Sequence, residues 1–230
     1  MSSLRDKKTV SKLICYSNPR SQVAEAYRTL RTNIHFSASN LKTMIVTSAE
    51  PGEGKTTTIS NLAIVFAQSG KKVLLLDGDL RKPSVHRVFR LSNTTGLSDL
   101  LLGQIDDVAE VIQRIDEIGI DIIPAGKNPD TPTELISSPR MREVLVWLTM
   151  RYDLVLIDTP PLLPVTDSQV FSSFVDGVLL IIRSGKARRE HAKKAKSLLD
   201  HVGAKVIGVV LNDKKRGRED KAYYEYTEKE

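Results

Sequence analysis

The chain has 230 residues, enough for one α/β domain with a sizeable core, and its 40% hydrophobic and 27% charged residues are ordinary for a soluble globular protein. A single cysteine, Cys15, excludes an intramolecular disulfide, and apolar runs no longer than a strand exclude a membrane-spanning helix. The net charge of +6 is mild. Much of it lies on one late helix, which we interpret as a solvated face, so no nucleic-acid partner is expected; its cations are Lys186, Arg188, Arg189, Lys193, Lys194 and Lys196.

We expect residues 1–20 to form a flexible N-terminal segment, because the first dozen are polar and basic. The pattern of residues 21–37 predicts a helix. Its apolar stripe recurs at i, i+4, i+7 and i+11 and consists of Val23, Tyr27, Leu30 and Ile34. The opposite face carries the polar residues Glu25, Arg28 and Arg31.

Six apolar runs of strand length alternate with helical or loop segments. The predicted strands are 43–47, 71–77, 120–123, 154–157, 177–182 and 205–211. This alternation predicts an α/β fold with a mostly parallel central sheet and helices on both faces. Ligands of such sheets bind at the carboxyl ends of the strands, so we expect the chemistry in the residues that follow each strand.

The first strand runs into a glycine-rich loop, residues 48–57, that precedes a helix. Strand, loop and helix place backbone N–H groups and the positive end of a helix dipole around an anion. The first glycine of the usual G-x-x-x-x-G-K-[ST] pattern is replaced by Ala49. Lys55 adds a charge for the outer phosphates, and the Thr56 hydroxyl is placed to ligate Mg²⁺. The loop therefore predicts a nucleoside triphosphate site made by Gly52, Glu53, Gly54, Lys55, Thr56 and Thr57.

Acidic residues follow two of the predicted strands. Asp158 ends the fourth strand, as the Walker-B aspartate does when it organises the water shell of Mg²⁺. Asp77 and Asp79 flank one glycine at the end of the second strand, aimed at the same site. Phosphoryl transfer needs an acid that organises the metal and a group that orients or deprotonates the nucleophile. The pair can supply both.

Three of the six tyrosines lie within the last eight residues, as Tyr223, Tyr224 and Tyr226. We expect residues 213–230 to be a disordered tail because they are polar and charged, so packing does not explain the enrichment. Phosphorylation substrates are the favoured explanation. A tyrosine hydroxyl has a pKa of about 10, so a carboxylate that takes its proton would assist transfer.

Together these features resemble the bacterial tyrosine kinases of capsule and exopolysaccharide systems, a branch of the deviant P-loop ATPases. The resemblance rests on the phosphate loop, a Walker-A′ stretch over 76–83, a Walker-B stretch over 157–161, the tyrosine cluster and Glu25-x-x-Arg28-x-x-Arg31. It implies a P-loop kinase domain over 21–212. It also implies that the helix 21–37 lies at a subunit interface and supports a ring-shaped homo-oligomer.

By this resemblance the cofactors are ATP and Mg²⁺. Lys55 and Thr56 would hold the phosphates and the metal, with Asp79 and Asp158 completing the metal shell. Asp77 is preferred as acceptor of the tyrosine proton, although the roles of Asp77 and Asp79 can be exchanged. Asn212 matches the position at which related ATPases read the adenine edge.

The family transfers the γ-phosphoryl group of ATP to tail tyrosines of a neighbouring subunit, in regulation of exopolysaccharide synthesis. The resemblance to its Gram-positive arrangement implies a cytoplasmic kinase that a membrane-anchored activator recruits to the inner face of the plasma membrane through a cytoplasmic segment. A cognate tyrosine phosphatase is also expected.

Two other functions stay open. A partition or division-site ATPase switch would hydrolyse ATP without phosphorylating tyrosine, but those proteins carry a lysine early in the loop where this chain has Glu50. A glutamate cannot stabilise the phosphates of a partner's nucleotide. A non-catalytic nucleotide-sensing subunit is the second alternative, and the presence of the lysine and both acids argues against it.

Overall fold

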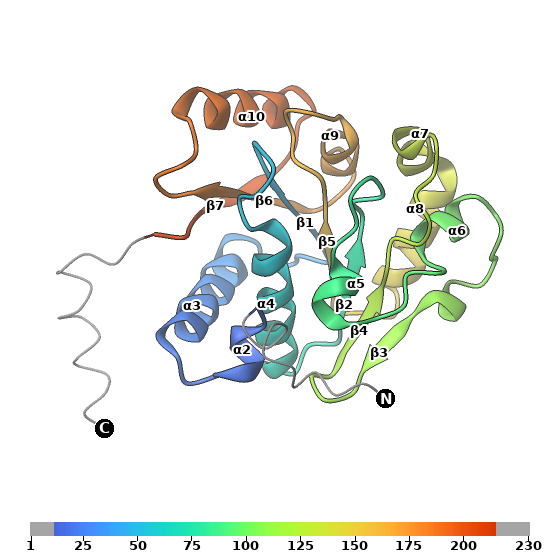
Figure 1. Ribbon diagram of the computed structural model, residues 1–230, viewed down its shortest axis with the longest axis horizontal. Helices are drawn as coiled ribbons and strands as arrows, with labels where there is room; N and C mark the ends of the chain where they lie inside the picture. The colour runs from blue at the N-terminus through green and yellow to red at the C-terminus, as the bar shows by residue number, and fades with distance from the viewer. Residues whose placement is uncertain (1–11, 215–230) are drawn as a thin grey trace.

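The computed structural model describes residues 12–214, so Tyr223, Tyr224 and Tyr226 lie outside the described residues (Figure 1). Its central sheet has the strand order β3-β4-β2-β5-β1-β6-β7. The strands are β1 (Thr43–Ser48), β2 (Val73–Asp77), β3 (Gln113–Ile115), β4 (Ile120–Ile123), β5 (Leu154–Asp158), β6 (Gly177–Arg183) and β7 (Val206–Asn212). Neighbouring strands are parallel except β3 and β4, which are antiparallel.

Helices cover both faces of this sheet (Figure 1). One layer contains α2 (Ile14–Ser17), α3 (Gln22–Ser37), α4 (Lys55–Gln68) and α5 (Val85–Phe89). The other contains α6 (Leu97–Leu101), the 3₁₀ helix η1 (Val108–Val111), α7 (Pro132–Ser137), α8 (Pro139–Thr149), α9 (Asp167–Ser172) and α10 (Arg189–His201). The predicted fold class is confirmed. Within residues 12–214, every helix is too short or too polar to span a bilayer.

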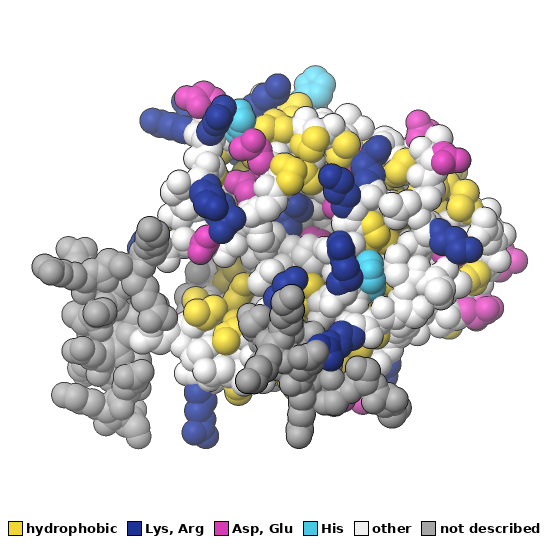
Figure 2. Space-filling model, viewed as in Figure 1, with side chains coloured by type: hydrophobic (Ala, Val, Ile, Leu, Met, Phe, Trp, Pro, Cys, Tyr) yellow, Lys and Arg dark blue, Asp and Glu magenta, His cyan; other side chains and the backbone are white. Residues whose placement is uncertain are grey.

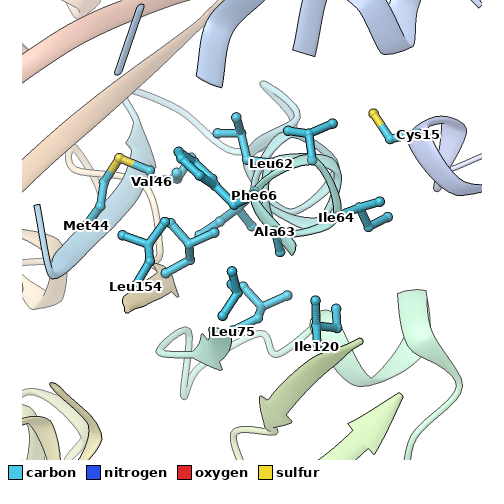
Figure 3. Packing of buried hydrophobic residues seen from close by; sticks show 14 of the residues in the cluster. Cys15, Met44, Val46, Leu62, Ala63, Ile64, Phe66, Leu75, Ile120 and Leu154 are labelled. Atoms are coloured by element: carbon cyan, nitrogen blue, oxygen red, sulfur yellow. The ribbon is translucent and has the colours of Figure 1, made fainter. Parts of the chain in front are cut away.

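The helix α4 lies at the centre of its layer and is buried along most of its length. Met44 and Val46 of β1 point into this layer, while Ile45 between them points to the opposite one, as the pleat of a strand requires. Figure 3 shows Leu62 and Phe66 of α4 packed over these strands. The burial of α4 fixes the position of its N-terminus, where the phosphate loop ends.

The short helix α2 packs against α4, so the expectation of a flexible segment over residues 1–20 is wrong for residues 12–17. Leu13 and Cys15 are 1% and 0% exposed. Asn61 of α4 receives a hydrogen bond from the Cys15 N–H (3.0 Å) and donates one to the Lys12 carbonyl (2.7 Å). Burial raises the pKa of the Cys15 thiol to about 12, which leaves it unreactive at neutral pH. The composition of residues 1–20 could not reveal that Cys15 has a hydrogen-bond partner 46 residues away in the chain.

Replacing Leu13 with alanine should lower the free energy of unfolding by about 2–4 kcal/mol, because the side chain is fully buried and its removal leaves a cavity. Urea unfolding followed by circular dichroism would measure this loss. The matched control is Val146→Ala on α8, where the valine is exposed and the expected change is within about 0.5 kcal/mol. Equal unfolding midpoints for the Leu13 variant and the wild type would contradict the packing of α2.

The helix predicted over 21–37 is present as α3, and three of the four predicted stripe residues, Tyr27, Leu30 and Ile34, pack against the core. Ser21 caps the helix by accepting the Ala24 N–H (3.2 Å). Ala24 is buried, whereas Val23 is 46% exposed. Arg31 was expected on the face opposite the core, yet its guanidinium donates to the Val65 carbonyl of α4 (2.8 Å). A long side chain can reach the core from the helix flank, which apolar periodicity does not anticipate.

The basic cluster lies on α10 and the loop before it, and its six cations are exposed as predicted. In Figure 2 the blue Lys and Arg side chains over α10 stand among magenta acidic and cyan histidine side chains. Lys196 forms an ion pair with Asp200, and His191 lies 2.9 Å from Glu50 of the phosphate loop. This mixed surface is typical of a solvated helix face.

Candidate active site

The phosphate loop connects β1 to α4 at the carboxyl edge of the sheet. Gly52 and Gly54 adopt left-handed φ angles of 79° and 95°, which favour glycine. A Cβ at position 54 would also lie 2.1 Å from Nδ2 of Asn212. The helix α4 begins at Lys55, so its first N–H groups face the loop. This is the backbone arrangement of an anion site.

Two residues predicted to bind nucleotide brace the loop in this structure. The Glu53 carboxylate accepts the N–H of Glu50 (3.1 Å) and the N–H of Arg183 (3.3 Å) and is buried. Asn212 donates through Nδ2 to the Glu53 carbonyl (2.8 Å). Both side chains therefore hold the loop's shape. The adenine-reading role of Asn212 stays a prediction.

Sequence reasoning missed Arg183, which ends β6. Its Nε donates to Asp213 (2.8 Å) and its Nη1 to the Gly52 carbonyl (3.3 Å). Asp213 has a φ of 56°, unusual for a residue with a side chain, and directly follows β7. The rule that ligand-binding residues follow strand ends would have pointed to both positions.

The two strand-terminal aspartates face each other across the β2–β5 pair, with Asp77 in register with Asp158. Both are buried. Burial is the main cause that raises the pKa of Asp77 well above its usual value, and the nearby Asp158 adds to it. Burial likewise raises the pKa of Asp158 to about 7, although a hydrogen bond from Thr56 and the charge of Lys55 oppose the shift.

These acids and Thr56 fit a magnesium ion. The Thr56 hydroxyl donates to Oδ2 of Asp158 (2.5 Å), while Oδ1 of Asp158 is buried without a hydrogen-bond partner. Such an orphaned carboxylate oxygen can accept from the water shell of a cation. Across residues 12–214, no group of three or more His, Cys, Asp or Glu side chains could hold a metal by itself. Mg²⁺ commonly uses one or two carboxylates together with substrate phosphates, which matches this arrangement.

A cavity of about 400 Å³ opens beside the loop, and we call it the phosphate cavity. Its lining residues are Pro51, Gly52, Lys55, Thr56, Asp79, Arg81, Lys82, Ser84, Pro160, Pro161, Pro164 and Val165. Asp79 therefore reaches the cavity. Asp77 lies behind the lining, where its carboxylate accepts the N–H groups of Ser84 (3.0 Å) and Val85 (2.9 Å).

The loop after β2 is anchored by Arg81, which lies in the Walker-A′ stretch but for which the sequence predicted no partner. Its guanidinium binds the buried Asp167 carboxylate through Nε (2.8 Å) and Nη2 (3.1 Å). Thr133 joins them, accepting from Arg81 (2.9 Å) and donating to Asp167 (2.6 Å). This network ties the Walker-A′ loop to α7 and α9, two short helices that the sequence pattern did not reveal.

The structure thus brings together the predicted loop residues and the three aspartates at one edge of the sheet. Thr57 lies half-buried in the first turn of α4. The predicted interface residues lie elsewhere, on α3, where Arg28 forms an ion pair with Glu25 (2.7 Å) and donates to the Pro19 carbonyl (2.9 Å).

A parallel sheet with this loop, lysine and aspartate pair defines the class of P-loop nucleotide-binding proteins. The family model described as an AAA domain matches residues 41–189. The tyrosine-protein kinase YwqD of Bacillus subtilis is 44% identical over 92% of this chain and 90% of its own length. The putative tyrosine-protein kinase CapB of Staphylococcus aureus is 36% identical over 97% and 99%.

Among solved structures, the chimerical protein CapA2B2 superimposes with a TM-score of 0.86 and 39% identity, covering 90% of this chain and 91% of that one. The chain belongs to the bacterial tyrosine-kinase family and is a protein-tyrosine kinase. The family resemblance expected from the motifs is confirmed.

Proposed function

We propose that this kinase uses Mg-ATP to phosphorylate Tyr223, Tyr224 and Tyr226 of a neighbouring copy and thereby regulates capsule or exopolysaccharide synthesis. The observation that carries the proposal is the convergence of Lys55, Thr56 and the aspartates on one accessible cavity. The names of the relatives support tyrosine as the acceptor.

In this proposal the N–H groups of Gly52 and Gly54 cradle the β- and γ-phosphates of ATP, and Lys55 neutralises part of their charge. Thr56, Asp79 and Asp158 would hold Mg²⁺, which would supply further charge neutralisation on the phosphates. Asn212 sits beside the loop, where it can exchange its contact with Glu53 for the adenine edge.

The transfer itself forms a bond between the tyrosine oxygen and the γ-phosphorus and breaks the bond from that phosphorus to the bridging oxygen of ADP. The phenolic proton passes to the Asp77/Asp79 pair. Asp79 is the member that lines the cavity. Asp77 is enclosed but has the raised pKa that makes a carboxylate a better base near neutral pH.

The surroundings of the kinase are also part of the proposal. We propose a ring-shaped homo-oligomer with an α3 interface that uses Glu25, Arg28 and Arg31, whose arginines would exchange contacts within their own chain for contacts with a neighbour. We further propose that a second, membrane-anchored protein activates the kinase, and the similarity to the CapA2B2 chimera supports this proposal. That activator would hold the kinase in the cytoplasm at the inner face of the plasma membrane, and a tyrosine phosphatase would reverse the reaction.

Mass spectrometry after incubation with Mg-ATP and an activator segment should find phosphate on Tyr223, Tyr224 or Tyr226. To test transfer between copies, a chain with Lys55→Met is mixed with one whose three tail tyrosines are phenylalanine. Phosphate on the Lys55→Met chain is expected, because the other copy supplies the working site. ATP hydrolysis that leaves every tyrosine unmodified would favour the ATPase switch.

A further inference from the structure

The phosphate cavity has two chemically different sides. Lys55, Thr56 and Asp79 form the polar side. Four other lining residues come from the loop after β5 and carry no charge; we call Pro160, Pro161, Pro164 and Val165 the proline wall. Phosphates and metal need only the polar side. The proline wall therefore offers a surface for an apolar part of a second substrate.

Hydrogen bonds hold the proline wall in place. The Pro160 carbonyl accepts from the Thr47 hydroxyl of β1 (2.9 Å) and from the Ser168 hydroxyl of α9 (2.5 Å). Pro160 and Pro161 are buried, whereas Pro164, which also lines the cavity, is exposed. A wall fixed before binding costs little conformational entropy when a ligand packs on it. A flat phenol ring suits such a surface better than a small aliphatic hydroxyl does.

Two cations, Arg81 and Lys82, also line the cavity, and only one of them is already in an ion pair. Arg81 is committed to Asp167. Lys82 is exposed, and its ammonium forms no ion pair within residues 12–214. The Lys82 backbone N–H donates to Oδ1 of Asp79 (2.9 Å), so both residues belong to the same turn of the loop that lines the cavity. A free ammonium at this position is suited to a carboxylate on an incoming peptide.

The chain's own tail has the matching sequence, Tyr223-Tyr224-Glu225-Tyr226-Thr227-Glu228. Every tyrosine in it lies within two residues of a glutamate. A peptide of this composition would bring both a phenol ring and a nearby carboxylate to the cavity.

We propose that the phosphate cavity selects tyrosines with an acidic neighbour: the proline wall packs on the phenol ring, and Lys82 pairs with a carboxylate one or two residues away. This inference rests on the proposed tyrosine kinase site and deepens it. It assigns Lys82 and Pro164 to specificity for the peptide and not to the binding of ATP.

The test uses the full chain with its three tail tyrosines changed to phenylalanine, so that the tail does not compete. Two peptides carry one tyrosine each, flanked by glutamates in one and by lysines in the other. We expect kcat/KM for the glutamate peptide to be roughly tenfold higher, because an exposed ion pair and the removal of a like-charge contact each contribute a few-fold. The preference should shrink in high salt.

Lys82→Glu should reverse the preference between the two peptides at saturating ATP, a comparison within one variant that any change in its KM for ATP affects equally. The matched control, Lys193→Glu, makes the same charge change on exposed α10 and should keep the wild-type preference. Pro164→Gly should raise KM for both peptides and leave KM for ATP unchanged. A melting temperature near that of the parent chain shows that each variant is folded.

Equal kcat/KM for the two peptides in the parent chain, or an unaltered preference in Lys82→Glu, would overturn the inference while the kinase assignment stands. Failure to phosphorylate either peptide or the natural tail, with ATP still hydrolysed, would overturn the proposed function and this inference together.

Discussion

Replacing Lys55 with methionine should reduce tyrosine phosphorylation by at least about a hundredfold, the loss typical of removing one charged group that stabilises a transition state. The side chain is buried at the start of α4 and lines the phosphate cavity. Methionine has a similar length and apolar stem, so the substitution removes the charge with little change in packing. Incorporation of labelled phosphate from ATP into the tail measures the effect.

Lys205→Met is the matched control, because Lys205 is exposed and precedes β7 away from the cavity lining. It should retain wild-type activity. Thermal unfolding should give both variants a melting temperature near that of the parent. Substantial phosphorylation by the Lys55 variant would mean that the phosphate loop is not where transfer occurs.

The sequence could predict those parts of the site that are formed by residues close together in the chain. A buried strand followed by glycines and a lysine fixes the phosphate loop, because the loop's φ angles demand glycine at Gly52 and Gly54. Asp158 and Asp77 were predictable for a similar reason, since each ends a continuous apolar strand. Their pairing follows from the adjacency of β2 and β5.

The contacts that the sequence could not predict join residues that are far apart in the chain. Arg81 reaches Asp167, 86 positions later, and Arg183 reaches the phosphate loop from 131 positions away. Neither contact leaves a periodic signal, because each is made by one polar side chain to a residue far away in the sequence. The antiparallel strand β3 was missed because its three residues are too few for alternation to be recognised.

Changing Asp158 to asparagine should stabilise the protein when metal and nucleotide are absent, although it should abolish Mg-dependent activity. In the folded chain Asp158 is buried beside Asp77, and its pKa is about 7 instead of 3.8. A raised carboxyl pKa means that the folded state binds the proton more tightly than the unfolded state does. Its contribution to stability is therefore fully present below about pH 4 and is lost as the pH rises through 7.

The asparagine side chain can still accept a hydrogen bond from the Thr56 hydroxyl but carries no charge. The variant therefore does not lose stability as the pH rises through 7. In EDTA its advantage in unfolding free energy should grow between pH 5 and pH 8 to about 2–4 kcal/mol. Denaturant titrations of both proteins at several pH values measure the difference. Mg-ATP should then stabilise the wild type more than the variant, because the charge that weakens the empty site is the one proposed to hold the metal. If the difference in unfolding free energy between the two proteins stayed constant across that pH range, ionisation of the buried Asp158 would not be what destabilises the folded wild type.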